Sequence, residues 1–453
     1  MASKGQSVES NVLKQYSRLV HDFWRGGCTA QSTLLLGPSF KRSRTMRILV
    51  TLAISICGLR MQAAAFPSLL ETVDAQILNK ENSTACKLSA SDGSSDSSGF
   101  GSSRRCATSV GTLNAFMLFV DFSDNIAKDT TQSLYDFFVP QAAEWYKNSS
   151  YGRLKFNVTA DLSRFHRMPK PSSSYNWNRG FSGATHSAYI REAIDAYMEA
   201  NNKTSFQMTD VLYVIPTSSV VNPPISATYV AEVRSSSGIR FAKTAVTLGP
   251  NAFKVWKYKV INHETGHTMC LPDLYKENPS GGASLHEYVG GFDIMGNILA
   301  VSPDYFAYHK WKLGWLLDSQ VDCVTKSGIT THTVSAIEVL GNATDTKAVV
   351  IKRSRNSALI AEVRSRLGND AKGCAVGVLL YTLSTNASTG SIKVIDTTPN
   401  SGGCGEQKSK EAYHELNDAP LTVGKSFAVA EWNVKVNVTG QSGTSYTFTV
   451  EYT

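Results

Sequence analysis

The stretch Val260-Ile-Asn-His-Glu-Thr-Gly-His-Thr-Met-Cys-Leu-Pro-Asp273 decides how the rest of the sequence is interpreted. Within it, His263, Glu264 and His267 form the pattern H-E-x-x-H. On a helix, residues four positions apart lie on one face, a single turn apart. Two imidazoles in this arrangement can bind one zinc ion, and a glutamate beside the first can polarise a water molecule at the metal. The apolar residues before the pattern predict a buried helix, which Pro272 prevents from continuing.

The residues that follow the helix supply the other parts of a metal site. Asp273 lies ten residues after His263, where the longer zinc-binding pattern H-E-x-x-H-x-x-G-x-x-H places its third ligand. Three protein ligands plus one water describe a catalytic rather than a structural zinc site. Further on, Met295 stands in the glycine-bounded segment Gly290-Gly-Phe-Asp-Ile-Met-Gly296, as a methionine turn under the metal requires. We therefore expect one zinc ion held by His263, His267 and Asp273.

Five segments resemble, in the same order, the immune inhibitor A family of secreted zinc metalloproteases. They include that family's S-Y-G-x-L segment, its zinc helix with an L-P-D-x-Y exit, and its W-D-x-M-G turn. The matching segments here are Leu113–Asp124, Trp145–Leu154, His263–Tyr275, Gly291–Gly296 and Ser302–Leu316. The resemblance covers residues 110–320, and 321–453 more loosely. It implies an endopeptidase with a metzincin-like catalytic domain and Asp273 as the third ligand.

Two positions depart from the family pattern. Cys270 stands where a glycine normally follows the second histidine, and Phe292 replaces the tryptophan of the turn. Glycine lets the chain leave the helix with a positive φ at little steric cost. A cysteine there implies a different exit or a tolerated strain of about 1–3 kcal/mol. Because Pro272 and Asp273 are kept, we expect the carboxylate still to reach the metal.

The activity expected from these residues is zinc-dependent hydrolysis of peptide bonds in proteins or peptides. Glu264 would take a proton from the attacking water and pass it to the leaving amine. Met295 would form an apolar floor under the metal. An alternative is a secreted, non-catalytic binding glycoprotein on a degenerate protease scaffold, in which a Cys270 thiolate closes the open metal position. Calcium binding is a further possibility, but no acidic loop has convincing ligand spacing for it.

Charge and hydropathy at the start of the chain predict secretion. Residues 1–65 contain nine Lys or Arg and two acidic residues, a net charge of +7, so of the total of +8 the remainder carries only +1. This balance gives no indication of a nucleic-acid or anionic-membrane partner. We interpret 46–65 as a signal peptide with a short apolar core and 1–45 as an upstream extension outside the mature protein. The alternative is a signal anchor, and hence a membrane-tethered protease.

The cysteines and glycosylation motifs also agree with secretion. Six cysteines remain after the leader, an even number that suits oxidising conditions. Proximity in sequence suggests Cys86–Cys106 and Cys374–Cys404, leaving Cys270 and Cys323, although six cysteines permit fifteen pairings. In an alternative interpretation, Cys106 is a free thiol that binds the zinc ion and keeps the enzyme latent. Seven N-x-S/T motifs fit a glycoprotein, at Asn82, Asn148, Asn157, Asn202, Asn342, Asn386 and Asn437.

Hydrophobic periodicity predicts an α+β chain with two folded domains. Residues 66–109 form a Ser/Gly-rich N-terminal segment, which we interpret as a short propeptide with a flexible stretch at 89–103. Strands and helices then alternate over 110–320, as expected for a twisted sheet plus the zinc helix in a catalytic domain. From 321 to 453 the helical period disappears. Short strands between Gly, Asn and Ser turns predict an all-β, sandwich-like C-terminal domain.

Three further polar residues near the predicted site have weaker assignments. His286 either donates a hydrogen bond to the developing oxyanion or, as we expect, lies at the surface or behind the ligands. Asp293 either supports a ligand or caps a turn, and we expect the turn. His309 lies in a predicted helix, 305–313, which we interpret as a core element backing the site, and it is given no role.

Overall fold

The computed structural model describes residues 83–90, 97–101, 105–177, 180–277, 283–300, 303–387, 389–404 and 414–453. The chain divides into two units, Met1–Asn79 and Lys80–Thr453, and every described residue belongs to the second. The upstream extension and the signal peptide expected at 1–65 lie outside the described residues. Within the described part, no helix is both long and apolar enough to cross a membrane.

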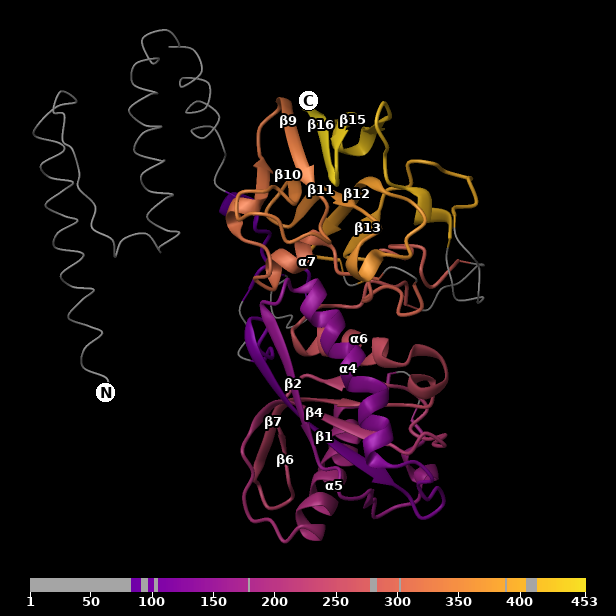
Figure 1. The fold of residues 1–453 in the computed structure, drawn as a ribbon. Helices are drawn as coiled ribbons and strands as arrows, with labels where there is room; N and C mark the ends of the chain where they lie inside the picture. Colours follow the sequence, from indigo (N-terminus) through magenta and orange to yellow (C-terminus); the bar gives the residue numbers. More distant parts are fainter. Residues whose placement is uncertain are drawn as a thin grey trace, which may run out of the picture. The chain divides into compact units, whose positions relative to one another are not determined.

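A seven-stranded sheet forms the part of the fold that carries the H-E-x-x-H helix (Figure 1). Its main path is β2-β1-β4-β7-β5, with β3 paired to β1 and β6 paired to β7. Neighbouring strands run parallel, except that β5 and β6 are antiparallel to β7. The strands are β1 (Gly111–Asp121), β2 (Leu154–Ala160), β3 (His166–Arg167), β4 (Thr209–Pro216), β5 (Ala227–Tyr229), β6 (Val233–Arg234) and β7 (Arg240–Thr247).

The central strand β1 is buried on both faces, as its continuous apolar run predicts. Alternate residues belong to different cores, with Met117 and Phe119 on one face and Leu118 and Val120 on the other. The first core includes residues of helix α4 (Thr131–Ser149) and the H-E-x-x-H helix α6 (Tyr258–Thr268), and the second includes residues of α5 (Gly183–Ala200). The sheet therefore has helices on both faces.

Two further sheets build the C-terminal part of the chain. One has the order β13-β12-β11-β10-β8, and the other has the order β14-β15-β16-β9. The five-stranded sheet consists of β8 (Val321–Val324), β10 (Ala348–Lys352), β11 (Ser357–Arg364), β12 (Gly377–Ser384) and β13 (Ile392–Val394). The four-stranded sheet consists of β9 (Gly328–Ser335), β14 (Ser426–Val429), β15 (Val434–Ser442) and β16 (Ser445–Tyr452). The sequence missed β8, because four residues with an aspartate among them give no clear periodicity.

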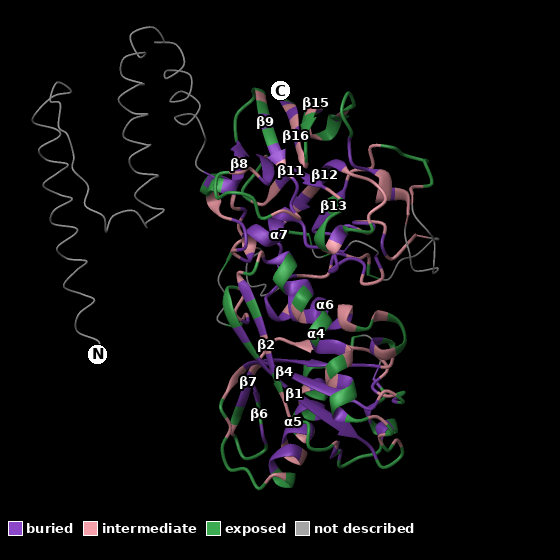
Figure 2. Cartoon of the chain, in the orientation of Figure 1, coloured by how far each residue is buried: buried purple, intermediate pink, exposed green. Residues whose placement is uncertain are grey.

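The five-stranded sheet is covered on both sides. Val349 and Leu380 point into a core shared with the four-stranded sheet, so the two sheets form a sandwich. Their neighbours Val350 and Tyr381 belong instead to the large core that contains α6 and the short helix α7 (Ala307–Lys312). Figure 2 shows much of β11 and β12 coloured as buried. The fold is therefore mixed α/β with several sheets, which is compatible with the expected α+β class.

The N-terminal segment packs against the fold where the structure describes it. Cys86, Leu88 and Ser98 have no exposed surface, and Phe100 packs edge-on against Tyr308 and Trp311. Within the stretch expected to be flexible, Ser97 to Phe100 therefore pack against the fold. The described short helices are Ser83–Cys86, Ser172–Tyr175, Asp318–Gln320, Gly368–Asp370, Glu415–Asp418 and Ala430–Trp432 of the 3-10 type, and Ala252–Trp256 of the π type.

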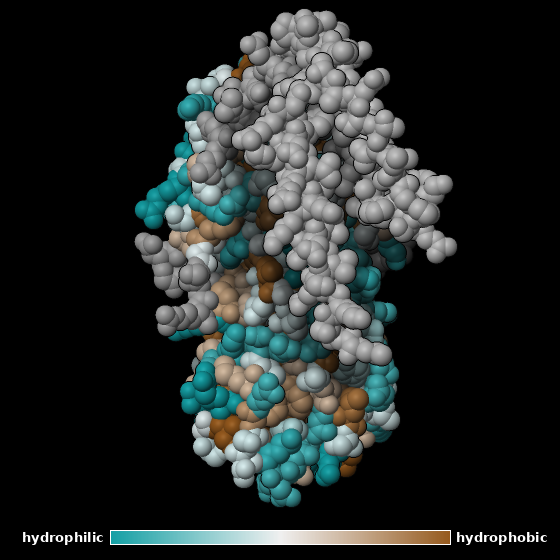
Figure 3. Space-filling view, turned by 60° about the vertical axis from the view of Figure 1, so that its left-hand side comes forward, coloured by the Kyte–Doolittle hydropathy of each residue, from teal (hydrophilic) through white to brown (hydrophobic). Residues whose placement is uncertain are grey.

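The surface visible in Figure 3 shows hydrophobic residues interspersed with hydrophilic ones over the described part. The large exposed hydrophobic side chains of the described residues are also scattered along the sequence, from Val110 to Val423. Isolated exposed apolar residues are normal on a soluble protein surface. They give no reason to assign a docking site.

Candidate metal centre

Helix α6 is held in the core at several points along its length. Tyr213 of the sheet shares a hydrogen bond of 2.6 Å with Thr265, and Tyr146 of α4 donates one of 2.7 Å to the carbonyl of Asn262. A Cβ atom on Gly266 would lie 2.5 Å from the sulfur of Met295, so only glycine allows this close approach. The helix is thereby fixed between the sheet and the methionine turn.

The helix ends in a Schellman motif with Cys270 at the left-handed position. The amide of Leu271 donates to the carbonyl of Gly266, and that of Cys270 donates to His267. Cys270 has φ +65°, the conformation for which glycine is usual. The chain therefore leaves the helix with the backbone conformation that is usual for glycine. The side chain of Cys270 makes this conformation less favourable by about 1–2 kcal/mol.

A disulfide and two hydrogen bonds hold this strained exit. Cys270 is bonded to Cys106, the amide of Ala107 donates to the carbonyl of Thr268, and the Lys312 ammonium donates to the carbonyl of Cys270. The pairing Cys86–Cys106 expected from sequence proximity is wrong, and so is the free latency thiol at Cys106. Cys86 instead pairs with Cys323 of β8, 237 residues away, and Cys374–Cys404 pairs as expected. Three disulfides are typical of proteins from oxidising compartments.

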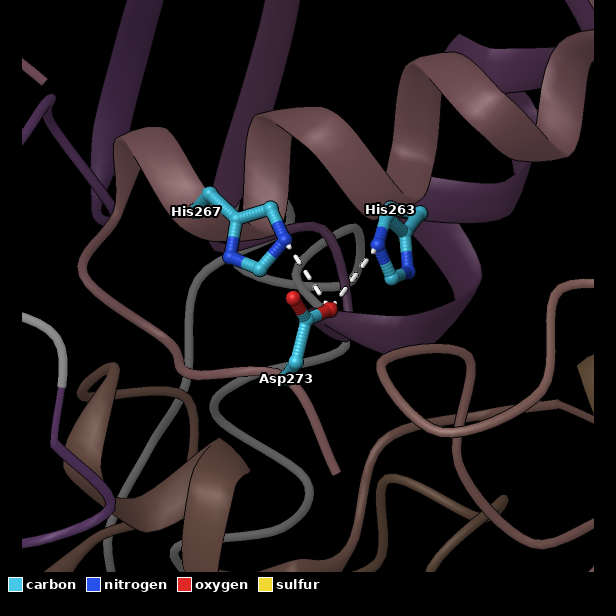
Figure 4. A group of neighbouring side chains, drawn as sticks. All are labelled: His263, His267 and Asp273. Carbon is cyan, nitrogen blue, oxygen red and sulfur yellow. Dashed lines mark ion pairs between the residues drawn. The ribbon is translucent and has the colours of Figure 1, made fainter. Parts of the chain in front are cut away.

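The three residues expected to bind a metal converge below α6 (Figure 4). The Nε2 atoms of His263 and His267 both lie 3.2 Å from Oδ1 of Asp273. This oxygen is buried and has no hydrogen-bond donor, whereas Oδ2 accepts a hydrogen bond of 2.7 Å from the Tyr275 hydroxyl. The arrangement therefore presents two ring nitrogens and one carboxylate oxygen to a common point.

Backbone carbonyls orient both imidazoles. Nδ1 of His263 lies 2.8 Å from the carbonyl oxygen of Ile294, and Nδ1 of His267 lies 2.8 Å from that of Leu271. A carbonyl oxygen can only accept, so each Nδ1 must carry a hydrogen. In the neutral ring the lone pair is then on Nε2, the atom that faces Asp273.

The electrostatic environment of the three residues favours a positive charge. Burial opposes ionisation of Asp273, but the facing rings of His267 and His263 bring the pKa of this carboxyl below its usual range. Burial also disfavours the charged form of His267, yet Asp273 and Glu264 raise its pKa to about 10.

The donor set and its spacing fit zinc. Two imidazoles and a carboxylate are a common set for a catalytic zinc ion. Ligand atoms about 2.05 Å from a tetrahedral ion are about 3.3 Å apart. The two nitrogen–oxygen distances of 3.2 Å agree with this value. Among the described residues, this is the one group of three His, Cys, Asp or Glu with metal-binding geometry.

Glu264 lies next to this group and is 6% exposed. The Thr228 hydroxyl lies 2.7 Å from its Oε2 atom and 2.9 Å from its backbone carbonyl. Thr228 belongs to β5, the antiparallel strand at the end of the sheet order. Sequence reasoning missed this residue, because nothing in the sequence around it shows that β5 lies beside α6.

The methionine turn is placed as the sequence predicts. Met295 is fully buried against Gly266 of α6. Asp293 caps the turn, since its carboxylate accepts hydrogen bonds from the amides of Met295 and Phe306. The expected capping role of Asp293 is therefore observed.

His286 and His309 are both buried beside this turn. Nδ1 of His286 lies 2.7 Å from the carbonyl oxygen of Gly296, and the residue is 6% exposed, so a surface position is wrong. His309 of α7 is fully buried, with Nδ1 3.4 Å from the Asp293 carboxylate and Nε2 3.2 Å from the Ser98 hydroxyl. It joins the turn to the N-terminal segment, a role that the sequence did not reveal.

The glycosylation motifs differ in accessibility. Asn82 lies outside the described residues. Asn148, Asn202, Asn342 and Asn386 are exposed, while Asn157 on β2 and Asn437 on β15 are half-buried. Four of the motifs therefore present their asparagine to solvent.

Comparison with models of known protein families gives no match, and comparison with curated proteins gives none either.

Proposed function

We propose that the protein is a secreted zinc metalloendopeptidase with a metzincin-like catalytic region. The observation that carries this proposal is the convergence of His263, His267 and Asp273 around a buried carboxylate oxygen that has no hydrogen-bond donor. A structural zinc site needs four protein ligands, whereas three ligands with a glutamate beside them fit a catalytic one. The resemblance to the immune inhibitor A family supports the same activity.

In the proposed reaction, His263, His267 and Asp273 hold the metal, and Tyr275 and the carbonyls of Ile294 and Leu271 orient them. Bound zinc would supply Lewis acidity, lowering the pKa of a water and polarising the scissile carbonyl. Glu264 takes a proton from the attacking water on its carboxylate. It then gives this proton to the leaving amine, so that the carboxylate is regenerated.

The substrate in this proposal is an extended peptide. β5 lies at the end of the strand order and next to α6. An extended chain can add to such an edge through backbone hydrogen bonds. This would present a peptide bond to Glu264 and the metal.

The test is casein hydrolysis by the purified, zinc-loaded protein beside a Glu264→Ala variant with the same zinc content. We expect activity in the first and a loss of several orders of magnitude in the second, since general acid–base catalysis alone contributes about 10²–10⁴. Equal inactivity of both with zinc bound would reject the peptidase. It would favour the alternative of a non-catalytic binding glycoprotein, although Cys270 is disulfide-bonded and no longer supports that alternative.

A further inference from the structure

Thr228 connects the edge of the sheet to the proposed base. Its hydroxyl has one hydrogen and two acceptors in reach, Oε2 of Glu264 at 2.7 Å and the carbonyl oxygen of the same residue at 2.9 Å. The carboxylate is closer and charged, and charge-assisted hydrogen bonds are the stronger ones. The hydrogen is therefore donated mainly to the carboxylate.

Glu264 depends on this donor. Its side chain is almost fully buried, where a carboxylate without a donor is costly. Among the described residues, Thr228 is the side chain that donates a hydrogen bond to it. A buried glutamate with a single donor takes its orientation from that donor, because the rotation of its carboxylate is otherwise only weakly restricted.

The strand fixes the position of Thr228. It is opposite Val246 of β7 in the register, and its half-buried side chain faces α6. A β-branched residue is also stiff about χ1, which limits where the hydroxyl can lie.

We propose that Thr228 is a positioning residue, which holds the Glu264 carboxylate for proton transfer and aligns it with the strand that receives the substrate. This rests on the proposed peptidase function. Thr228 itself does not exchange a proton with the substrate. It acts by keeping one carboxylate oxygen occupied, so that the carboxylate stays in one orientation.

The experiment compares Thr228→Val and Thr228→Ser with the zinc-loaded wild-type protein on a peptide substrate. Valine keeps the shape of threonine without the hydroxyl, and serine keeps the hydroxyl. Thr159→Val is the matched control, since Thr159 lies on β2 at the opposite end of the strand order and donates to a backbone carbonyl. Zinc content and melting temperature are measured for each protein.

We expect Thr228→Val to lower kcat roughly 10- to 100-fold, with KM and zinc content unchanged, because misorientation of a catalytic group acts on the chemical step. Thr228→Ser should restore most of the activity, and Thr159→Val should have none of this effect. If the wild-type protein is active and the two valine variants have equal kcat, the positioning role of Thr228 is overturned. The peptidase function is not affected by that result. A loss of activity that only follows a loss of zinc would also overturn it. An inactive wild-type protein would instead reject the peptidase function.

Discussion

Two regions of this molecule bury several charged side chains, and they balance these charges differently. In one region, Arg364 of β11 pairs with Glu362 at 2.6 Å and with Asp370 at 2.7 Å. Nearby, Lys310 of α7 pairs with Asp304 at 2.8 Å. Below α6, one carboxylate faces two imidazoles, and its Oδ1 atom has no hydrogen-bond donor. The first network contains its own cations, although Nη2 of Arg364 and Oε2 of Glu338 beside it have no hydrogen-bond partner, whereas in the second three potential metal ligands converge.

The difference separates a cluster of paired charges from a candidate metal site. The Arg364 guanidinium also lies over the rings of Phe306 and Phe292, at 5.3 and 5.6 Å from their centroids. Burial opposes its charge, but Glu362 and Asp370 raise its pKa above the usual range. The ion pairs of such a network form with no external ion. In the candidate metal site, by contrast, two imidazole nitrogens and one carboxylate oxygen converge.

The largest expected effect is on metal affinity. We expect Asp273→Ala to weaken zinc binding by more than about 100-fold, since loss of a group that only supports a ligand already costs about 10- to 100-fold. Tyr275→Phe, which removes the hydrogen bond to Oδ2, should have a smaller effect of about 10-fold. Competition with a chromophoric chelator measures both affinities. Unchanged affinity in Asp273→Ala would exclude this residue as a ligand.

The next effect is on stability, and it should leave the candidate metal centre unchanged. Arg364→Met leaves two carboxylates buried without their cation, which we expect to lower the free energy of unfolding by about 3–5 kcal/mol. Urea unfolding with the disulfides intact measures this loss.

A second variant identifies the cause of that loss. Adding Asp370→Asn to Arg364→Met should recover part of it, because the two side chains are in contact. If Arg364→Met lowers the free energy of unfolding by less than about 1 kcal/mol, Arg364 contributes no more than an exposed ion pair does.

The smallest effect concerns a third kind of buried group, one that stays neutral. Burial lowers the pKa of His186 from its usual 6.5 to about 4. Between these values the unfolded chain binds a proton that the folded chain does not, so stability falls as the pH falls from about 6.5 to about 4. The loss is up to about 3 kcal/mol.

A substitution isolates this contribution. His186→Gln should remove that part of the pH dependence while keeping a polar group near Thr247. Unfolding curves of both proteins at several pH values between 4 and 7 give the difference. Parallel stability profiles would show that His186 has the same pKa in the folded and unfolded protein.

The sequence predicted those features that depend on neighbours along the chain. The spacing of His263 and His267 placed both rings on one face of a helix, and the apolar run in β1 predicted a strand buried on both faces. The spacing from His263 to Asp273 in the sequence predicted that this carboxylate lies near the two histidines, as it does.

Features that depend on distant segments could not be predicted. Cys106 pairs with Cys270 rather than with the nearer Cys86, because it lies beside the end of α6. Thr228 contacts Glu264 across 36 residues, and Arg364 would be expected at the surface from its charge alone. These contacts depend on how strands are paired and which faces are covered, and short-range patterns do not encode that information.

The Cys106–Cys270 bond also determines what happens when the chain is cut. It closes a covalent ring that contains all seven strands of the large sheet and α6. The Cys86–Cys323 bond closes a second ring around the first. A single cleavage in any loop between Cys106 and Cys270 therefore leaves two fragments joined, with both histidines and Asp273 in one covalent molecule. A nicked protein would run as one band on a non-reducing gel and separate only after reduction.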